Sequence, residues 1–525
     1  MLSIGGTLAL GSAVYTVARI RDGSLQAHVA KLALRLAAAA PGKAGEKVAK
    51  DKDDAITHLK AGLMAADPPG VQSFRALPAV GLPHADVLAQ LEALRVRDDV
   101  HWKGKHGRVS GCVYYADSEH HRFLAAAQEK YLISNPLHPD VWPSLTKMES
   151  EVCHMARDLL HGDAATVSGV VTSGGTESIL LALKMYRDYG AAVRGITRPQ
   201  VVMCQTAHAA FDKAAQYFNI ELVKVPCDPV TFAMDIAATR RAMGSRVVAI
   251  VGSAPQYPHG AVDNIEALAA IARQYGCGLH VDGCLGGFLL PFLVAHGVDL
   301  GTKFDFLVPE VTSMSADTHK YGYSTKGTSV LLVRGTELKH HMYFCTAEWP
   351  GGVYASPTIA GSRPGALSVG CWASLVSIGR DGYMKLAAGI IGTFNALKAA
   401  VARGDAGPLR ILGDTRAMIL AFDRKTDADP DIQRWCSGMA ERGWNLNRLQ
   451  DPNAVHICLT AALIGCEHDF ISDSKAVFEA LVADPTLHAS GAARIYGMTA
   501  ALPGALKSVL IADLVNNYLD AKTDL

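Results

Sequence analysis

Short apolar runs alternate with helix-like stretches through the middle of this chain, from about Val167 to Val333. Such runs, rich in β-branched residues and bounded by turn residues, are typical of buried strands. They occur at 201–205, 221–226, 247–253, 277–282, 305–311 and 328–333. Strands that alternate with helices predict an α/β fold, with a mostly parallel central sheet and helices on both faces. Ligands of such sheets bind beyond the carboxyl ends of the strands.

The sequence on either side of this block has a different pattern. Residues 20–110 are Ala-rich and helix-like, and after about residue 375 long helices precede separated strands at 416–424 and 454–460. We therefore divide the 525 residues into a helical N-terminal segment (1–110), a large α/β domain (111–375) and a smaller α+β C-terminal domain (376–525).

The first residues leave two interpretations open. Residues 2–18 carry no charge and are followed by Arg19 and Arg21. About 17 residues barely span a bilayer, and the stretch lacks the basic start of a signal peptide. We expect a packed or dimer-contacting segment here, with a weak N-terminal membrane anchor as the alternative.

Composition excludes several classes of protein. About half of the residues are apolar (49%), and 50 basic side chains balance 50 acidic ones. A nucleic-acid-binding protein would show a basic excess, and a disordered chain would be less apolar. The eleven cysteines are scattered without a CxxC pair, which indicates reduced thiols in the cytoplasm and argues against structural zinc.

A candidate anion site opens the first helical pattern of the central block. Gly174 and Gly175 precede Thr176, where an apolar pattern of helical period begins. Backbone N–H groups at a helix start bind anions, and glycine lets a phosphate come close. An ordinary turn would explain the glycine pair equally well.

Two further candidates follow predicted strands. Asp282 ends an apolar strand, where a carboxylate is costly to bury unless it meets a cation or a donor. A helix N-cap or a structural ion pair is the alternative. His208 follows the strand at 201–205, and on its own it is explained as readily by an exposed imidazole.

The stretch THKYGYSTKG holds two lysines, Lys320 and Lys326. A lysine desolvated in an apolar pocket has a lowered pKa and can form a Schiff base. Taken singly, either lysine is more simply a surface residue, because lysines are seldom buried.

Together these signals meet the needs of one cofactor, pyridoxal 5'-phosphate. It requires an anion site, a flat group over its ring, a carboxylate at its ring nitrogen and a lysine that forms a Schiff base. The candidates for these four roles are, in the same order, Gly174 to Thr176, His208, Asp282 and Lys320.

The motifs that carry these residues resemble one known family. The stretches TSGGTES, TAHAAFDKAAQYF, SAPQYPHG, VDGCLGGF, THKYGYSTKG, AGSRPG and IYGM are similar to those of the pyridoxal-phosphate-dependent group II decarboxylase superfamily. Within it they resemble most closely the sphingosine-1-phosphate lyases. The resemblance runs from about residue 110 to residue 500.

This resemblance implies a fold-type-I homodimer with active sites at the subunit interface. Ser362 would reach the cofactor phosphate from the partner subunit, and His319 would help to hold that phosphate. Positions around the substrate's phosphate or reacting hydroxyl are matched by Tyr114, His138, Lys326 and Tyr496. The general base is left open between Lys326 and His138.

The implied activity is retro-aldol cleavage of a phosphorylated sphingoid base into a long-chain aldehyde and phosphoethanolamine. An amino-acid decarboxylase is one alternative, because it shares Lys320, Asp282 and His208 but not the phosphate clamp, and a fold does not fix the reaction. A non-catalytic protein that keeps the fold is another. A lipid substrate would explain membrane contact without requiring it, and no nucleic-acid partner is expected.

Overall fold

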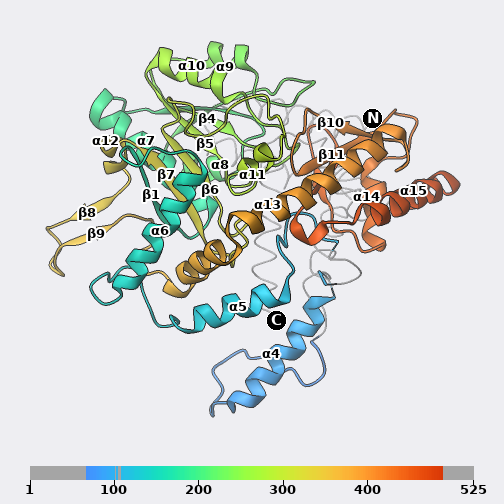
Figure 1. Ribbon diagram of the computed structural model, residues 1–525, viewed down its shortest axis with the longest axis horizontal. Helices are drawn as coiled ribbons and strands as arrows, with labels where there is room; N and C mark the ends of the chain where they lie inside the picture. Colours follow the sequence, from blue (N-terminus) through green and yellow to red (C-terminus); the bar gives the residue numbers. More distant parts are fainter. Residues whose placement is uncertain (1–66, 101, 104–107, 489–525) are drawn as a thin grey trace, which may run out of the picture.

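The structure is a computed structural model that describes residues 67–100, 102–103 and 108–488 (Figure 1). Its centre is a seven-stranded sheet in the order β1-β7-β6-β5-β4-β2-β3. The strands are β1 (Val167–Thr172), β2 (Gln200–Cys204), β3 (Glu221–Val225), β4 (Val247–Ser253), β5 (Gly278–Asp282), β6 (Ser313–Ala316) and β7 (Ser329–Arg334). Six of these strands run in the same direction, and β7 alone runs in the opposite direction. The predicted mostly parallel sheet is therefore confirmed.

Helices cover both faces of this sheet. On one face α7 (Gly175–Arg194) and α8 (Ala210–Phe218) pack against alternate apolar residues of β2, β4 and β7. The other face packs against α6 (Pro143–Leu159), α10 (Ile265–Tyr275), α11 (Leu290–Ala295) and α13 (Gly365–Arg403). Shorter helices at the periphery are α9 (Ile236–Ala242) and α12 (Thr336–His340).

Five of the six strands predicted for the central block correspond to β2, β3, β4, β5 and β7. The strand predicted at 305–311 is wrong, because these residues form turns and β6 begins only at Ser313. Asp305 Oδ1 accepts a hydrogen bond from Leu307 N (3.0 Å), which closes a turn. Pro309 has no backbone N–H to give to a sheet. Strand β1 was not predicted.

A second sheet lies in the C-terminal part of the chain. It is antiparallel, in the order β10-β11-β13-β12, and the two predicted strands are neighbours in it. The strands are β10 (Leu409–Leu412), β11 (Ile419–Arg424), β12 (Asn447–Leu449) and β13 (Ala454–Cys458), with the helices α14 (Ile432–Glu441), η1 (Ala461–Leu463) and α15 (Glu467–Ala483).

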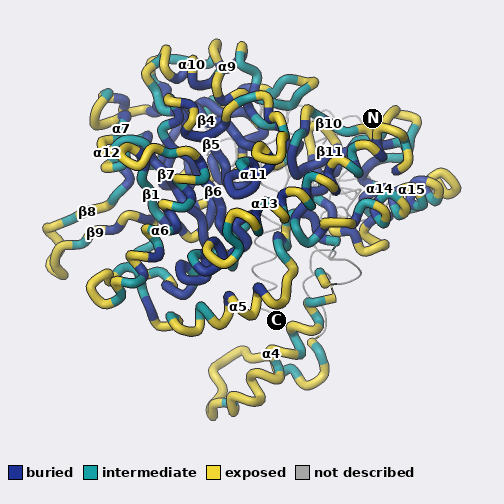
Figure 2. The backbone as a smooth tube through the Cα atoms, viewed as in Figure 1, coloured by how far each residue is buried: buried dark blue, intermediate teal, exposed yellow. Residues whose placement is uncertain are grey.

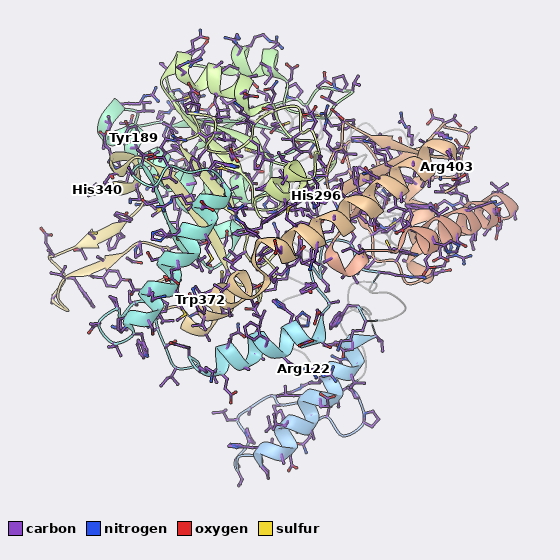
Figure 3. All side chains as sticks on the ribbon, viewed as in Figure 1. Arg122, Tyr189, His296, His340, Trp372 and Arg403 are labelled. Atoms are coloured by element: carbon purple, nitrogen blue, oxygen red, sulfur yellow. The ribbon has the colours of Figure 1, made fainter. Side chains whose placement is uncertain are left out.

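Helix α13 runs from the large sheet to the C-terminal sheet and is kinked at Gly379 (φ 60°, ψ 175°). His296 Nε2, after α11, hydrogen-bonds to Met384 O (2.8 Å), and Trp372 Nε1 donates to Glu151 Oε2 of α6 (2.7 Å) (Figure 3). Within the described ranges, α13 is the one helix long and apolar enough to cross a membrane, by length and composition only. The predicted domain boundary near residue 375 falls inside it and stays a prediction.

The described part of the N-terminal segment contains α4 (His84–Asp99), which has no buried residue and is yellow and teal in Figure 2. It is followed by α5 (Ser118–Glu129), which contacts α13. A hairpin of β8 (Phe344–Thr346) and β9 (Tyr354–Ser356) projects from the other side of the molecule (Figure 1). The predicted segment at residues 2–18 and the candidate Tyr496 lie outside the described residues.

Candidate active site

The predicted anion site is the N-terminus of α7, where the chain leaves β1. Gly174 has a φ of 141°, a conformation that favours glycine, and α7 begins at Gly175. A Cβ on Gly175 would lie 2.6 Å from Asp317 Oδ1, so a larger residue does not fit there. Gly174 is therefore required by its backbone conformation, and Gly175 by the close approach of Asp317.

This helix start opens onto a cavity of about 570 Å³. Six predicted site residues line it: Gly174, Gly175, Thr176, His208, His319 and Lys320. The remaining lining residues are Ser173, Glu177, Ile179, Leu180, Cys284, Ile359 and Ala360. The structure thus brings together residues from five separate stretches of the sequence.

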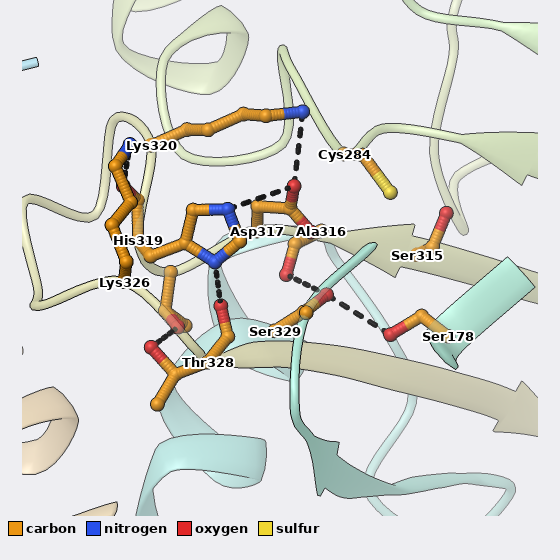
Figure 4. A network of polar contacts seen from close by, with 12 residues as sticks. Ser178, Cys284, Ser315, Ala316, Asp317, His319, Lys320, Lys326, Thr328 and Ser329 are labelled. Carbon is orange, nitrogen blue, oxygen red and sulfur yellow. Dashed lines mark hydrogen bonds and ion pairs between the residues drawn. The ribbon is translucent and has the colours of Figure 1, made fainter. Parts of the chain in front are cut away.

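Lys320 lies against Asp317, a residue that the sequence analysis did not select (Figure 4). Lys320 Nζ is 2.9 Å from Asp317 Oδ2, and His319 Nε2 is 3.5 Å from the same oxygen. Burial is the largest single influence and lowers the pKa of Lys320, but the charge and hydrogen bond of Asp317, together with Cys284 and Asp282, hold that pKa above its usual value. The lowered pKa expected from burial alone is therefore wrong, because a buried counter-ion sits three residues away.

His319 is held in one orientation by its other ring nitrogen. Nδ1 is 2.6 Å from Thr328 O (Figure 4), and a carbonyl oxygen only accepts, so Nδ1 carries a proton. Nε2 then faces Asp317 and the cavity. Burial lowers the pKa of His319, whereas the charge of Asp317 opposes this effect.

Asp282 ends β5 and His208 follows β2, as predicted. Asp282 is buried, and its Oδ1 accepts hydrogen bonds from Cys284 N (3.0 Å) and Ser315 Oγ (3.3 Å). The ring of His208 is exposed in the cavity wall. Its Nδ1 accepts from Ala210 N (3.1 Å), which orients the imidazole at the start of α8.

Lys326 contacts Tyr114 and lies next to His319. Lys326 Nζ lies 4.5 Å from the centre of the Tyr114 ring and donates to His319 O (3.4 Å). Burial lowers the pKa of Lys326. Tyr114 is buried, and burial raises the pKa of its hydroxyl well above the usual value, so this hydroxyl stays protonated at neutral pH.

His138 and Ser362 are exposed and do not line the cavity of their own chain. They lie on two turns joined by Asn135, whose Nδ2 donates to Ser362 Oγ (3.0 Å). Asn135 Oδ1 also accepts from Arg363 N (3.2 Å). The structure thus places these two candidates near each other but outside the lining of the cavity that contains Lys320.

Two buried carboxylates were missed. Asp317 directly follows β6, just as Asp282 ends β5, but the strand was predicted at 305–311, so the strand-end rule did not point to Asp317. Glu177 accepts from Ser173 N (2.6 Å), Ile359 N (2.9 Å) and Ala360 N (3.3 Å). Its partners at 359–360 are far away in the sequence, and no local pattern indicates them.

Comparisons with known proteins define the class first. The pyridoxal-dependent decarboxylase conserved domain matches residues 122–405, more than half of the chain. A glutamate decarboxylase from Lactobacillus brevis has a TM-score of 0.65 at 20% identity, over 80% of this chain and 96% of that one, which shows the shared fold. The family model and the fold together define a pyridoxal-phosphate-dependent enzyme.

Proteins with higher sequence identity to this chain define its family within that class. The sphingosine-1-phosphate lyase of Dictyostelium discoideum is 42% identical over 85% of this chain and 81% of its own, and that of Saccharomyces cerevisiae is 38% identical over 86% and 76%. The structure of the sphingosine-1-phosphate lyase from Burkholderia pseudomallei has a TM-score of 0.74 at 42% identity, over 78% of this chain and 93% of that one. The chain belongs to the sphingosine-1-phosphate lyase family.

The cofactor of this family is pyridoxal 5'-phosphate, and the residues present fit it. The α7 N-terminus offers backbone N–H groups beside a cavity that contains a lysine amine. Asp317 Oδ1 is buried and has no hydrogen-bond partner among the described residues. A buried carboxylate oxygen of this kind needs a donor, which a cofactor-bound group would supply, because His319 Nε2 lies against the other oxygen, Oδ2.

Proposed function

We propose that this protein cleaves the C2–C3 bond of sphingosine 1-phosphate, or of a related phosphorylated sphingoid base. The products are a long-chain aldehyde and phosphoethanolamine. The proposal is carried by one observation: Lys320, a phosphate cradle and the pair of Lys326 and Tyr114 lie together. It is supported by relatives named for this activity that align over most of the chain.

The cofactor, when bound, supplies the electron sink that makes carbon–carbon cleavage feasible. In our proposal Lys320 attaches it, the Gly174–Thr176 backbone and His319 bind its phosphate, and His208 covers its ring. Asp282 keeps its ring nitrogen protonated.

Lys326 and Tyr114 are proposed to act on the substrate. A general base works best with a pKa near the working pH, and burial moves the pKa of Lys326 in that direction. Lys326 would thus bind the substrate phosphate or take the proton of the C3 hydroxyl. The protonated Tyr114 hydroxyl would donate a hydrogen bond to the substrate. His138 remains the alternative base, and the substrate-binding role of Tyr496 stays a prediction.

We propose that the enzyme is a homodimer in the cytoplasm whose subunits share their active sites. His138 and Ser362 are exposed outside their own cavity, which is the arrangement expected if they serve the partner's site. Mixing inactive Lys320→Ala and Ser362→Ala subunits would then restore activity, because one site of each mixed dimer holds both intact residues. Absence of recovery in verified mixed dimers would contradict shared sites.

The activity is tested with purified protein, sphingosine 1-phosphate and a panel of amino acids. We expect equal amounts of aldehyde and phosphoethanolamine from the phosphorylated base. Release of carbon dioxide from an amino acid without aldehyde formation would contradict the proposal and support a decarboxylase. Absence of turnover in a cofactor-loaded protein would support a non-catalytic role.

A further inference from the structure

A chain of buried polar side chains leads away from Asp282 into the interior of the sheet. Strands β5 and β6 are parallel neighbours, and their register pairs His280 with Ser313 and Asp282 with Ser315. His280 Nδ1 is 2.8 Å from Ser313 Oγ, and Nε2 is 3.3 Å from Ser315 Oγ. Ser315 Oγ is in turn 3.3 Å from Asp282 Oδ1. One imidazole thus connects the two serines of β6.

Tyr186 of α7 closes the far end of the chain. Its hydroxyl is 2.6 Å from Ser313 Oγ and 2.7 Å from Thr312 Oγ1. The ring passes over β5 at Gly278, where a Cβ would overlap it. Tyr186, Ser313, His280 and Ser315 are all at most 1% exposed. Polar groups this deep are costly unless each finds a partner, and here each does.

The direction of proton donation along these hydrogen bonds is fixed by the carboxylate of Asp282 and by the neutral ring of His280. A carboxylate only accepts, so the Ser315 hydroxyl donates to Asp282. Burial lowers the pKa of His280 to about 4, although Asp282 opposes this, so the ring is neutral and carries one proton. That proton lies on Nε2, facing Ser315, and Nδ1 accepts from the Ser313 hydroxyl. Every donor therefore points towards Asp282.

We propose that His280 and Ser315 are positioning residues that keep Asp282 ionised and oriented towards the cofactor's ring nitrogen. This inference rests on the proposed function. Hydrogen bonds to a carboxylate favour its charged form, and those from Ser315 and Cys284 N both end on Oδ1, so neither uses Oδ2. An ionised Asp282 leaves the shared proton on the ring nitrogen. Without the Ser315 hydroxyl, that proton shifts from the nitrogen to the carboxylate.

The test uses pyridoxal 5'-phosphate labelled with nitrogen-15 in its ring, bound to the full-length protein. Wild type is compared with Ser315→Ala and Tyr186→Phe by the NMR shift of the ring nitrogen and by the cofactor's dissociation constant. Ser474→Ala is the matched control, because Ser474 is also a fully buried serine with two hydrogen bonds. These bonds are to Trp435 Nε1 and Ala406 O, which lie outside the series of hydrogen bonds that leads to Asp282.

In Ser315→Ala we expect the nitrogen resonance to move towards the unprotonated position and the dissociation constant to rise about ten-fold. Tyr186→Phe should change both in the same direction but less, because its hydroxyl acts only through Ser313 and His280. It also keeps the test decisive if Ser315→Ala fails to fold. Ser474→Ala should match wild type.

Three results would refute the inference. Wild-type resonances in both Ser315→Ala and Tyr186→Phe would show that the chain does not influence Asp282. A wild-type resonance in Tyr186→Phe alone, with Ser315→Ala unfolded, would lead to the same conclusion. An equal shift in Ser474→Ala would show general loosening of the fold. Failure of the wild type to bind the cofactor would instead overturn the proposed function.

Discussion

Glu177 offers a sharp test of how the cavity is assembled, because its carboxylate joins two loops that are distant in sequence. Oε2 accepts from Ser173 N, and Oε1 accepts from Ile359 N and Ala360 N. The side chain is buried, with 8% exposed. Water therefore cannot readily replace the carboxylate as the acceptor for these N–H groups. All four residues in this contact line the cavity itself.

The change Glu177→Gln keeps one acceptor oxygen but places an NH₂ group against a backbone N–H. If the oxygen stays with the 359–360 loop, the bond to Ser173 is lost. A hydrogen bond to a charged group is worth about 1.5–3 kcal/mol. We therefore expect pyridoxal 5'-phosphate to bind roughly ten- to hundred-fold more weakly, with a lower melting temperature.

The assay is equilibrium titration of the cofactor, followed by thermal unfolding with and without it. Glu151→Gln is the control, since Glu151 accepts from Trp372 Nε1 on the surface of α6, away from the cavity. This control should bind the cofactor as wild type does. A Glu177→Gln protein with wild-type affinity and wild-type melting temperature would refute the bridging role of this carboxylate.

Three more predictions concern charge. Lys326→Ala should retain the cofactor but turn over sphingosine 1-phosphate about ten- to hundred-fold more slowly; unchanged turnover and substrate affinity would favour His138 as the base. Asp317→Asn should lower the pKa of Lys320 by about one unit or more, measured as the pH dependence of its chemical modification in cofactor-free protein; an unchanged profile would contradict the ion pair. Burial lowers the pKa of His259, His280 and His456 to about 4, so the unfolded state binds more protons below pH 6.5 and stability falls as the pH falls. At pH 4 each histidine lowers the free energy of unfolding by about 3 kcal/mol. Burial raises the pKa of Asp263 to about 6, and this offsets the contribution of about one histidine. A denaturant midpoint that does not fall from pH 7 to pH 4 would contradict this.

The sequence predicts best where one pattern determines one local structure. Strand β4 was predicted with its bounds, because its seven residues are buried on both faces and therefore read as an uninterrupted apolar run. The run at 305–311 looks similar, but Asp305 and Pro309 turn the chain there. Composition alone did not show that these two residues would outweigh the apolar ones.

The positions of candidate residues were predictable where a strand end or a motif marks them: His208 and Lys320 line one cavity, and Asp282 ends β5. Long-range contacts were not. The bonds from Glu177 to the 359–360 loop and the ion pair that raises the pKa of Lys320 depend on the folded chain. His138 and Ser362 were selected from motifs, but their exposed position became visible only in the structure.

Borohydride reduction of the cofactor-loaded protein, followed by peptide mass spectrometry, tests most directly whether Lys320 is the residue on which the site is built. The reductant makes the link between lysine and cofactor permanent, so the labelled peptide identifies the lysine. We predict one cofactor per chain, attached to Lys320, with Lys326 unlabelled and no label in Lys320→Ala. A label on Lys326 or elsewhere, or none in a protein that retains the cofactor, would contradict this assignment.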